Sequence, residues 1–262
     1  MKIARLFLTC LLGLGAMLVT VAPGTAQVDP KKFPAAKEAV ASFAARANGS
    51  EKSGEVPRAT DPAIKRLLDV ALDISDIEAA KTIPFQSLTP LSERMLLGTQ
   101  VGVIYMLSGT GATDIAQIGN DPAAGDKINL NVVKYPDEMG RYFDFAVTIQ
   151  ASIAQTVQGF MSTAKPAELA RPNFQSGLAD VRGGGTRTLS GTIETLAVNG
   201  LSDVWIRARL VALTAAAPKF RPFLLAEQRE ELRKLAIACA DVTDDARAKK
   251  VLQDFAVTIG GG

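Results

Sequence analysis

A run of three glycines between two arginines is the part of this sequence whose residue types best suit ligand binding. It reads Arg182-Gly-Gly-Gly-Thr-Arg-Thr188. Glycines let a loop turn its backbone N–H groups toward an anion, and a helix that begins near Thr186 would add its positive end. We therefore predict a site for a phosphate, sulfate or carboxylate, formed by Arg182, Gly183, Gly184, Gly185, Thr186 and Arg187. The segment lacks the Walker spacing, and the alternative is a flexible hinge between two helices.

A second group of polar side chains follows Gly109. Carboxylate and amide oxygens of this kind suit Ca²⁺. The group consists of Asp114, Asn120, Asp121, Asp126, Asn129 and Asn131. Their spacing matches no EF-hand loop, and Asp121-Pro122 equally suits the start of a helix. We therefore predict no metal site.

No complete catalytic motif occurs in the sequence. Ser162 and Lys165 match the S-x-x-K string of serine acyl-enzymes, but K-T-G is absent and Val204 stands where S-D-N requires asparagine. The chain contains no histidine, which excludes Ser-His-Asp and Cys-His nucleophiles, His-ligated haem and the usual catalytic zinc sites. Cys239 lies in an apolar helical pattern typical of a buried, inert thiol. We predict no catalytic residue and no cofactor, although enzymatic activity stays open.

Residues 1–26 have the three-part order of a secretory signal. Lys2 and Arg5 form a basic start, and a largely apolar run follows from Leu6 to Val21. Pro23 and the small residues up to Ala26 complete the pattern of a cleavage site. We predict cleavage after Ala26 and a periplasmic or secreted protein. The alternative is an uncleaved membrane anchor.

The composition after this cleavage limits the partners. Removing 26 of the 262 residues leaves 236, and removing two of the 29 basic residues leaves 27, equal to the 27 acidic ones. A neutral chain gives no electrostatic case for nucleic acid, which requires a basic face. No second apolar run is long enough to span a membrane, so no integral membrane segment is predicted after cleavage.

The remaining chain predicts an all-α fold of about eight helices in one bundle-like domain over residues 61–262. Residues 27–60 are predicted to form a short helix, 35–47, and a flexible linker. The clearest helix begins at Pro136 and runs to Phe160, with apolar residues every three or four positions. Residues 109–131 are predicted to be irregular, and 127–135 have an extended pattern. Other helices are predicted from residue 60, from 89 to 108, and at 173–182, 187–198, 202–216, 222–240 and 244–258.

Two repeated strings suggest a duplication. Asp-Phe-Ala-Val-Thr-Ile occurs at 144–149 and at 254–259, and Phe-Gln-Ser occurs at 85–87 and at 174–176. They predict repeat units over 85–160 and 174–259. The alternative is two similar core-facing helix segments, because the intervening lengths differ by about twenty residues.

These observations favour a non-catalytic envelope protein that binds a partner protein or a small ligand. Two alternatives stay open. One is a periplasmic enzyme acting on an anionic substrate held by residues 182–188, and the other is a carrier of lipid or of a small apolar ligand. The aromatic side chains with a polar end either line a ligand groove or pack in the core. They are Tyr105, Tyr135, Tyr142 and Trp205.

Overall fold

Eleven α-helices and one 3₁₀-helix form the regular structure of the described residues in the computed structural model. These residues are 29, 31–50, 55–80, 83–111, 122–198 and 200–261, so the predicted signal lies outside them. The elements are α1 (Lys32–Ser50), α2 (Pro62–Ala71), α3 (Ser75–Ala79), η4 (Phe85–Ser87), α4 (Leu88–Met106), α5 (Pro122–Lys134), α6 (Pro136–Thr163), α7 (Pro166–Leu169), α8 (Pro172–Thr195), α9 (Asp203–Phe220), α10 (Ala226–Val242) and α11 (Ala246–Gly260). No strand occurs among these ranges, and the prediction of an all-α bundle is confirmed.

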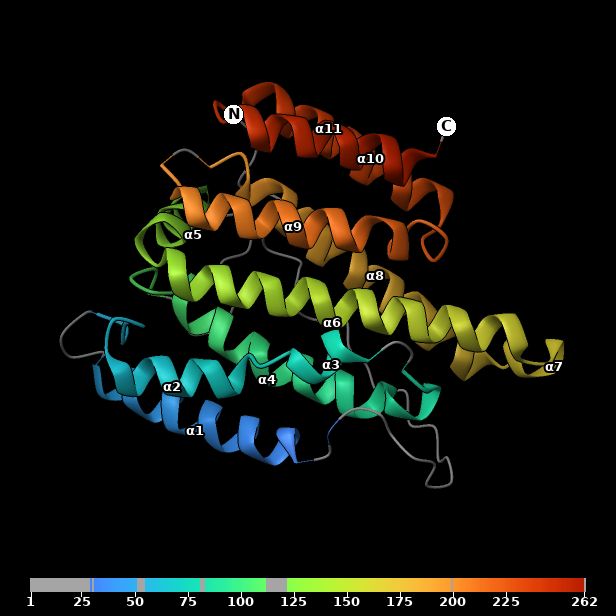
Figure 1. The fold of residues 1–262 in the computed structure, drawn as a ribbon, viewed down its shortest axis with the longest axis horizontal. Helices are drawn as coiled ribbons and strands as arrows, with labels where there is room; N and C mark the ends of the chain where they lie inside the picture. Colours follow the sequence, from blue (N-terminus) through green and yellow to red (C-terminus); the bar gives the residue numbers. More distant parts are fainter. Residues whose placement is uncertain are drawn as a thin grey trace.

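Helix α6 is the centre of the bundle, because most of its circumference is buried. Pro136 begins it where the missing N–H costs no hydrogen bond, and Asp137 and Glu138 favour a helix N-terminus. Apolar residues then follow at helical spacing and pack against α4, α8 and α9. Figure 1 shows the resulting layers, with α1 and α2 at one edge, α6 in the middle, and α10 with α11 at the other edge.

Two glycines bring α4 close to α6. A Cβ atom at Gly98 would overlap the ring of Phe145, and one at Gly102 would lie 2.7 Å from the ring of Tyr142. Both rings come from α6 and are buried, so these glycines serve close helix packing. The four aromatics with a polar end also pack in the core: Tyr105, Tyr135, Tyr142 and Trp205 are all buried.

The N-terminal helix differs from the predicted short leader. Helix α1 has 19 residues, and its Val40 and Phe43 belong to the same hydrophobic core as the rest of the bundle. The ring of Phe43 lies 5.5 Å from that of Tyr105 on α4, and Lys32 pairs with Asp73 at 2.5 Å. Helix α1 is therefore part of the domain. Residues 51–54 of the predicted linker lie outside the described residues.

Helix α5 occupies a segment for which the sequence predicted irregular and extended structure. Ile128 and Val132, four residues apart, are both buried. Asn131 donates from Nδ2 to the carbonyls of Met106 and Ser108, at 2.9 and 2.8 Å. This amide satisfies carbonyl groups at the end of α4, where a helix leaves them without partners. The prediction of an extended segment over 127–135 is wrong. The helix is stabilised by contacts with α4, which is distant in the sequence, so the local pattern does not indicate it.

Helix α9 continues through Pro218, although the sequence predicted an end at residue 216. Proline removes the N–H group that would bond the carbonyl of Thr214. Thr214 and Pro218 are both exposed, so water can bond this carbonyl instead. The longer helix includes Lys219 in its last turn.

The repeated strings occupy different surroundings. Phe85-Gln86-Ser87 forms η4, whereas the second copy lies inside α8. Both copies of the hexapeptide are helical, but Asp144 on α6 pairs with the buried Arg209, and Asp254 on α11 pairs with the exposed Lys250. Duplication of 85–160 as 174–259 stays a prediction, and the Phe-Gln-Ser match does not support it.

Candidate functional site

The glycine run predicted as an anion-binding loop lies in the interior of α8. This helix is continuous from Pro172 to Thr195, so the two predicted helices 173–182 and 187–198 are one, and the hinge alternative is wrong as well. Backbone N–H groups inside a helix bond the carbonyls four residues earlier and do not face a ligand. The structure therefore corrects the loop geometry on which the anion site depended.

Close packing against other helices accounts for two of the three successive glycines in α8. A Cβ atom at Gly184 would lie 3.3 Å from the side-chain amide of Gln150 on α6. One at Gly185 would lie 2.7 Å from the ring of Phe220 on α9. Each glycine costs about 1 kcal/mol of helix propensity, and the close approach of α8 to α6 and α9 offsets this cost.

The two arginines of the predicted site make different contacts. Arg182 donates from Nε to the carbonyl of Phe223 at 2.8 Å, and its guanidinium lies 5.5 Å from the centre of the Phe223 ring. Burial lowers the pKa of Arg182. Arg187 instead lies along Gly183, with Nη1 3.3 Å from the position of a Cβ there. Anion binding by Arg182, Gly183, Gly184, Gly185, Thr186 and Arg187 stays a prediction from the sequence, without the loop that motivated it.

The acidic and amide residues weighed for Ca²⁺ are only partly described. Asp114, Asn120 and Asp121 lie outside the described residues, and Asp126, Asn129 and Asn131 are on α5. Within the described ranges, no three His, Cys, Asp or Glu side chains are placed to hold a metal ion. Cys239 is buried on α10, and burial raises the pKa of its thiol to about 12. Such a thiol is a poor nucleophile.

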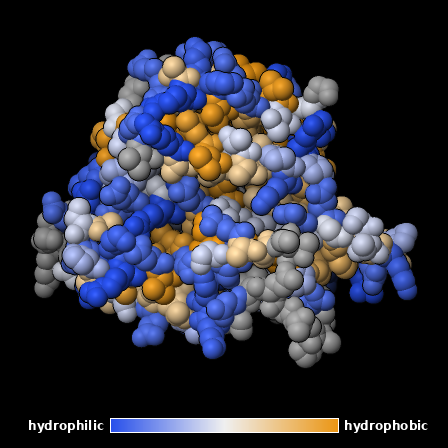
Figure 2. All heavy atoms as spheres, viewed as in Figure 1, coloured by the Kyte–Doolittle hydropathy of each residue, from blue (hydrophilic) through white to orange (hydrophobic). Residues whose placement is uncertain are grey.

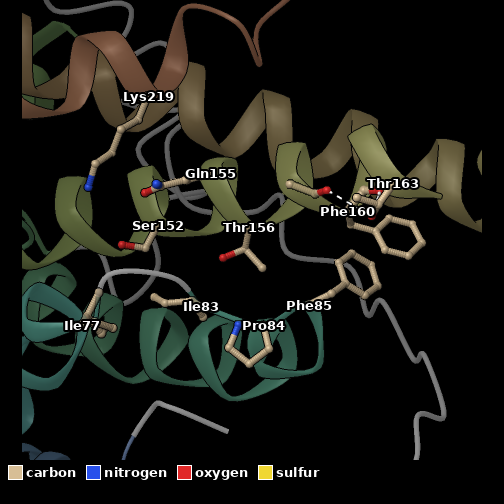
Figure 3. Close-up of a pocket in the computed structure, with 12 residues that line it drawn as sticks. Ile77, Ile83, Pro84, Phe85, Ser152, Gln155, Thr156, Phe160, Thr163 and Lys219 are labelled. Carbon is tan, nitrogen blue, oxygen red and sulfur yellow. Dashed lines mark hydrogen bonds between the residues drawn. The ribbon is translucent and has the colours of Figure 1, made fainter. Parts of the chain in front are cut away.

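A groove that the sequence did not predict runs along α6 (Figure 3). It consists of two adjoining hollows of about 630 and 390 Å³. Helix α6 forms the floor, α9 forms one wall, and the segment from α3 to η4 forms the other. The two hollows share Ile77, Ala80, Ser152 and Lys219, so they form one continuous depression.

Apolar side chains form most of the larger hollow. Ile74 and Ile77 line one side, and Val147 and Ala151 lie on the floor. Helix α9 contributes Val211, which is 71 % exposed, together with the alanines Ala208, Ala212, Ala215 and Ala216. The short side chains of these alanines leave the backbone of α9 accessible along this wall. Figure 2 shows apolar residues exposed among hydrophilic ones in the middle of this face.

The smaller hollow is lined by aromatic and aliphatic residues at the far end of α6. Ile83, Pro84 and Phe85 form its wall, and Phe85 stacks on Phe160 with ring centroids 4.0 Å apart. Phe160 also contacts the ring of Phe174 on α8, at 5.6 Å. This aromatic contact fixes η4 against α6 and thereby holds the wall of the groove in place.

A single lysine lies where the two hollows meet. Lys219 extends from α9 toward the floor, near Ser152 and Gln155 (Figure 3). The Ser152 hydroxyl donates to the carbonyl of Thr148 at 2.9 Å. Lys219 is partly exposed and has no ion-pair partner within the described ranges. The junction of the groove therefore carries an unpaired positive charge.

The other end of the larger hollow is acidic. Asp144 lines it and pairs with Arg209 of α9, whose side chain is fully buried. The guanidinium of Arg209 also lies 5.3 Å from the centre of the Trp205 ring. Burial lowers the pKa of Arg209 to about 10, although the charge of Asp144 acts to raise it. Burial raises the pKa of Asp144, the Arg209 charge lowers it, and the nearby charge of Glu78 raises it further. Asp144 keeps about a third of its side chain exposed, so it presents an oriented carboxylate to the groove.

Sequence patterns missed this groove because its residues come from three distant segments, 74–85, 144–163 and 207–219. One signal was present in the sequence: residues 210–217 are apolar apart from Thr214, so not all sides of this stretch of α9 can face polar surroundings, and Val211 is in fact exposed among the alanines. A helix surface that is apolar yet not buried commonly marks a contact surface.

The fold and this groove define an all-helical protein with an elongated, mostly apolar depression on its surface. No protein-family model, no curated protein and no solved structure matches the chain. Among the described helices, none combines the length and the apolar character needed to cross a membrane.

Proposed function

We propose that this protein is a non-catalytic binding protein whose groove along α6 receives an amphipathic helix of a partner. The observation that carries the proposal is the continuous, mostly apolar depression between α9 and the segment from α3 to η4. The floor from Asp144 to Thr163 spans about 28 Å at 1.5 Å per residue, which is the length of about five helical turns. Grooves of this shape bind the apolar face of a helix at positions i, i+3, i+4 and i+7.

The two alternatives from the sequence have less support. A lipid carrier requires an enclosed apolar cavity, whereas both hollows lie at the surface of the described molecule, with Val211 and Lys219 on their rim. An enzyme that holds an anionic substrate at residues 182–188 requires a loop, and those residues are helical. The partner-binding interpretation needs neither feature.

We also propose that the protein is exported, on the basis of the N-terminal sequence pattern. The expected result is a mature protein that begins at Gln27, since signal peptidase accepts small residues such as those before it. N-terminal sequencing of the protein from the periplasmic fraction of a bacterial host checks this. A chain that still begins with residues 1–26 in a membrane fraction would instead show an uncleaved anchor.

Replacing Val211 by glutamate is expected to weaken peptide binding by about tenfold or more, because a helix seated in the groove would desolvate the new charge. The probe is a fluorescently labelled 18-residue helical peptide with leucine on one face and alanine and glutamine elsewhere. Its affinity is measured by fluorescence anisotropy.

The control for this variant is Val257→Glu. Val257 lies on α11 outside the groove and is 74 % exposed, against 71 % for Val211. The control is expected to bind the peptide as the unaltered protein does. Equal losses in both variants, or no binding by the unaltered protein at about 100 µM peptide, where even a weak complex forms, would contradict the proposed function.

A further inference from the structure

The groove carries charges of opposite sign at two separate places. Asp144 and Glu78 line one end of the larger hollow, and Lys219 lies at the junction with the smaller hollow. Arg207 also lines the larger hollow, but its charge is paired with Asp203 at 2.5 Å. Asp144 is likewise paired with Arg209, so the net negative charge of this end comes from Glu78, and the junction is basic.

The separation of these charges follows from α9. Arg209 contacts Asp144, and Lys219 lies ten residues after Arg209 on the same helix. Ten residues at 1.5 Å each correspond to a rise of about 15 Å along α9 between Arg209 and Lys219, which is close to three helical turns. On a docked helix, residues that are 11 positions apart lie on one face at about this separation, because 11 residues complete three turns.

We propose that the groove selects a helix with one basic and one acidic residue 11 positions apart on its apolar face. This inference rests on the proposed function and specifies its partner. The basic residue faces Asp144 and Glu78, the acidic residue faces Lys219, and the apolar residues between them contact Val147, Ala151 and the alanines of α9. Apolar contact alone cannot distinguish one amphipathic helix from another, whereas charge matching suppresses wrong partners.

Four peptides that differ at only two positions test the charge match. All have the leucine face of the neutral probe, and positions i and i+11 carry lysine and glutamate, two lysines, two glutamates or two glutamines. The lysine–glutamate peptide is expected to bind about three- to tenfold more tightly than the other three at low salt. The preference is expected to shrink in high salt, because salt screens exposed charges.

A charge reversal in the protein provides the matched test. Lys219→Glu is expected to reverse the preference, so that the peptide with two lysines becomes the tightest ligand. Lys249→Glu, on the exposed surface of α11, changes the net charge equally and is expected to keep the original preference. Equal affinity of all four peptides, or the same shift in both variants, would overturn the charge inference while leaving groove binding in place. Failure of every peptide to bind would overturn both proposals.

Discussion

Asp144→Ala is expected to lower the free energy of unfolding by about 3–5 kcal/mol, because it leaves a buried arginine without its counter-ion. The side chain of Arg209 is fully buried, and Asp144 is its ion-pair partner. The three guanidinium nitrogens have no other hydrogen-bond partner within the described ranges. Urea unfolding followed by circular dichroism measures the change.

The second copy of the hexapeptide supplies a control for this substitution. Asp254 has the same five residues after it as Asp144, but it pairs with the exposed Lys250 at 2.9 Å. Surface pairs of this kind contribute less than about 1 kcal/mol, so Asp254→Ala is expected to have a small effect. Adding Arg209→Met to Asp144→Ala is expected to restore much of the stability, since an apolar side chain of similar length needs no counter-ion. Similar losses for Asp144→Ala and Asp254→Ala would show that Arg209 does not depend on Asp144.

The unfolding free energy is also expected to fall by roughly 3–5 kcal/mol as the pH rises from about 4.5 to about 8, because of one buried carboxyl group. Glu194 on α8 is buried, and neither of its side-chain oxygens has a hydrogen-bond partner within the described ranges. Burial raises the pKa of Glu194 to about 8. The folded protein therefore holds a proton that the unfolded chain releases near its ordinary pKa of 4.5. This contribution is complete below the unfolded pKa and is lost as the pH rises through the folded pKa.

Urea unfolding at pH 5 and pH 8 measures this dependence. Glu194→Gln is expected to flatten it, because the amide does not titrate, whereas Glu231→Gln on the exposed face of α10 is expected to leave it unchanged. The chain contains no histidine, so few other side chains titrate in this interval. An unaltered slope in Glu194→Gln would assign the pH dependence to another group.

The sequence predicted those elements whose signals are local. Helix α6 has a proline at its start and a regular apolar repeat, and both are visible in the sequence alone. For α8, the sequence wrongly predicts two helices, because three successive glycines disfavour a helix unless packing against other helices compensates. The compensation comes from Gln150 and Phe220, which lie on other helices and give no sign near residue 183.

The sequence predicts even less of the candidate site than of the fold. Its floor, its two walls and its charges come from segments that meet only after folding. The sequence instead predicted a binding site at the arginines beside the glycine run. In the structure, Arg182 donates a hydrogen bond to the carbonyl of Phe223. The pattern of arginines beside glycines was the strongest local signal for a binding site in the sequence. In the structure, Arg182 instead holds the turn that follows α9.

The same helix forms the floor of the groove and the centre of the core. One side of α6 carries fully buried residues such as Ile149, Ile153 and Val157, and another lines both hollows. Unfolding α6 therefore destroys the groove, so a ligand of the groove would bind only the folded chain. By mass action, such a ligand adds about 2.7 kcal/mol to the unfolding free energy at a hundred times its dissociation constant. A partner helix bound as proposed would therefore also stabilise the fold, and the amount of folded protein in a cell would follow the amount of that partner.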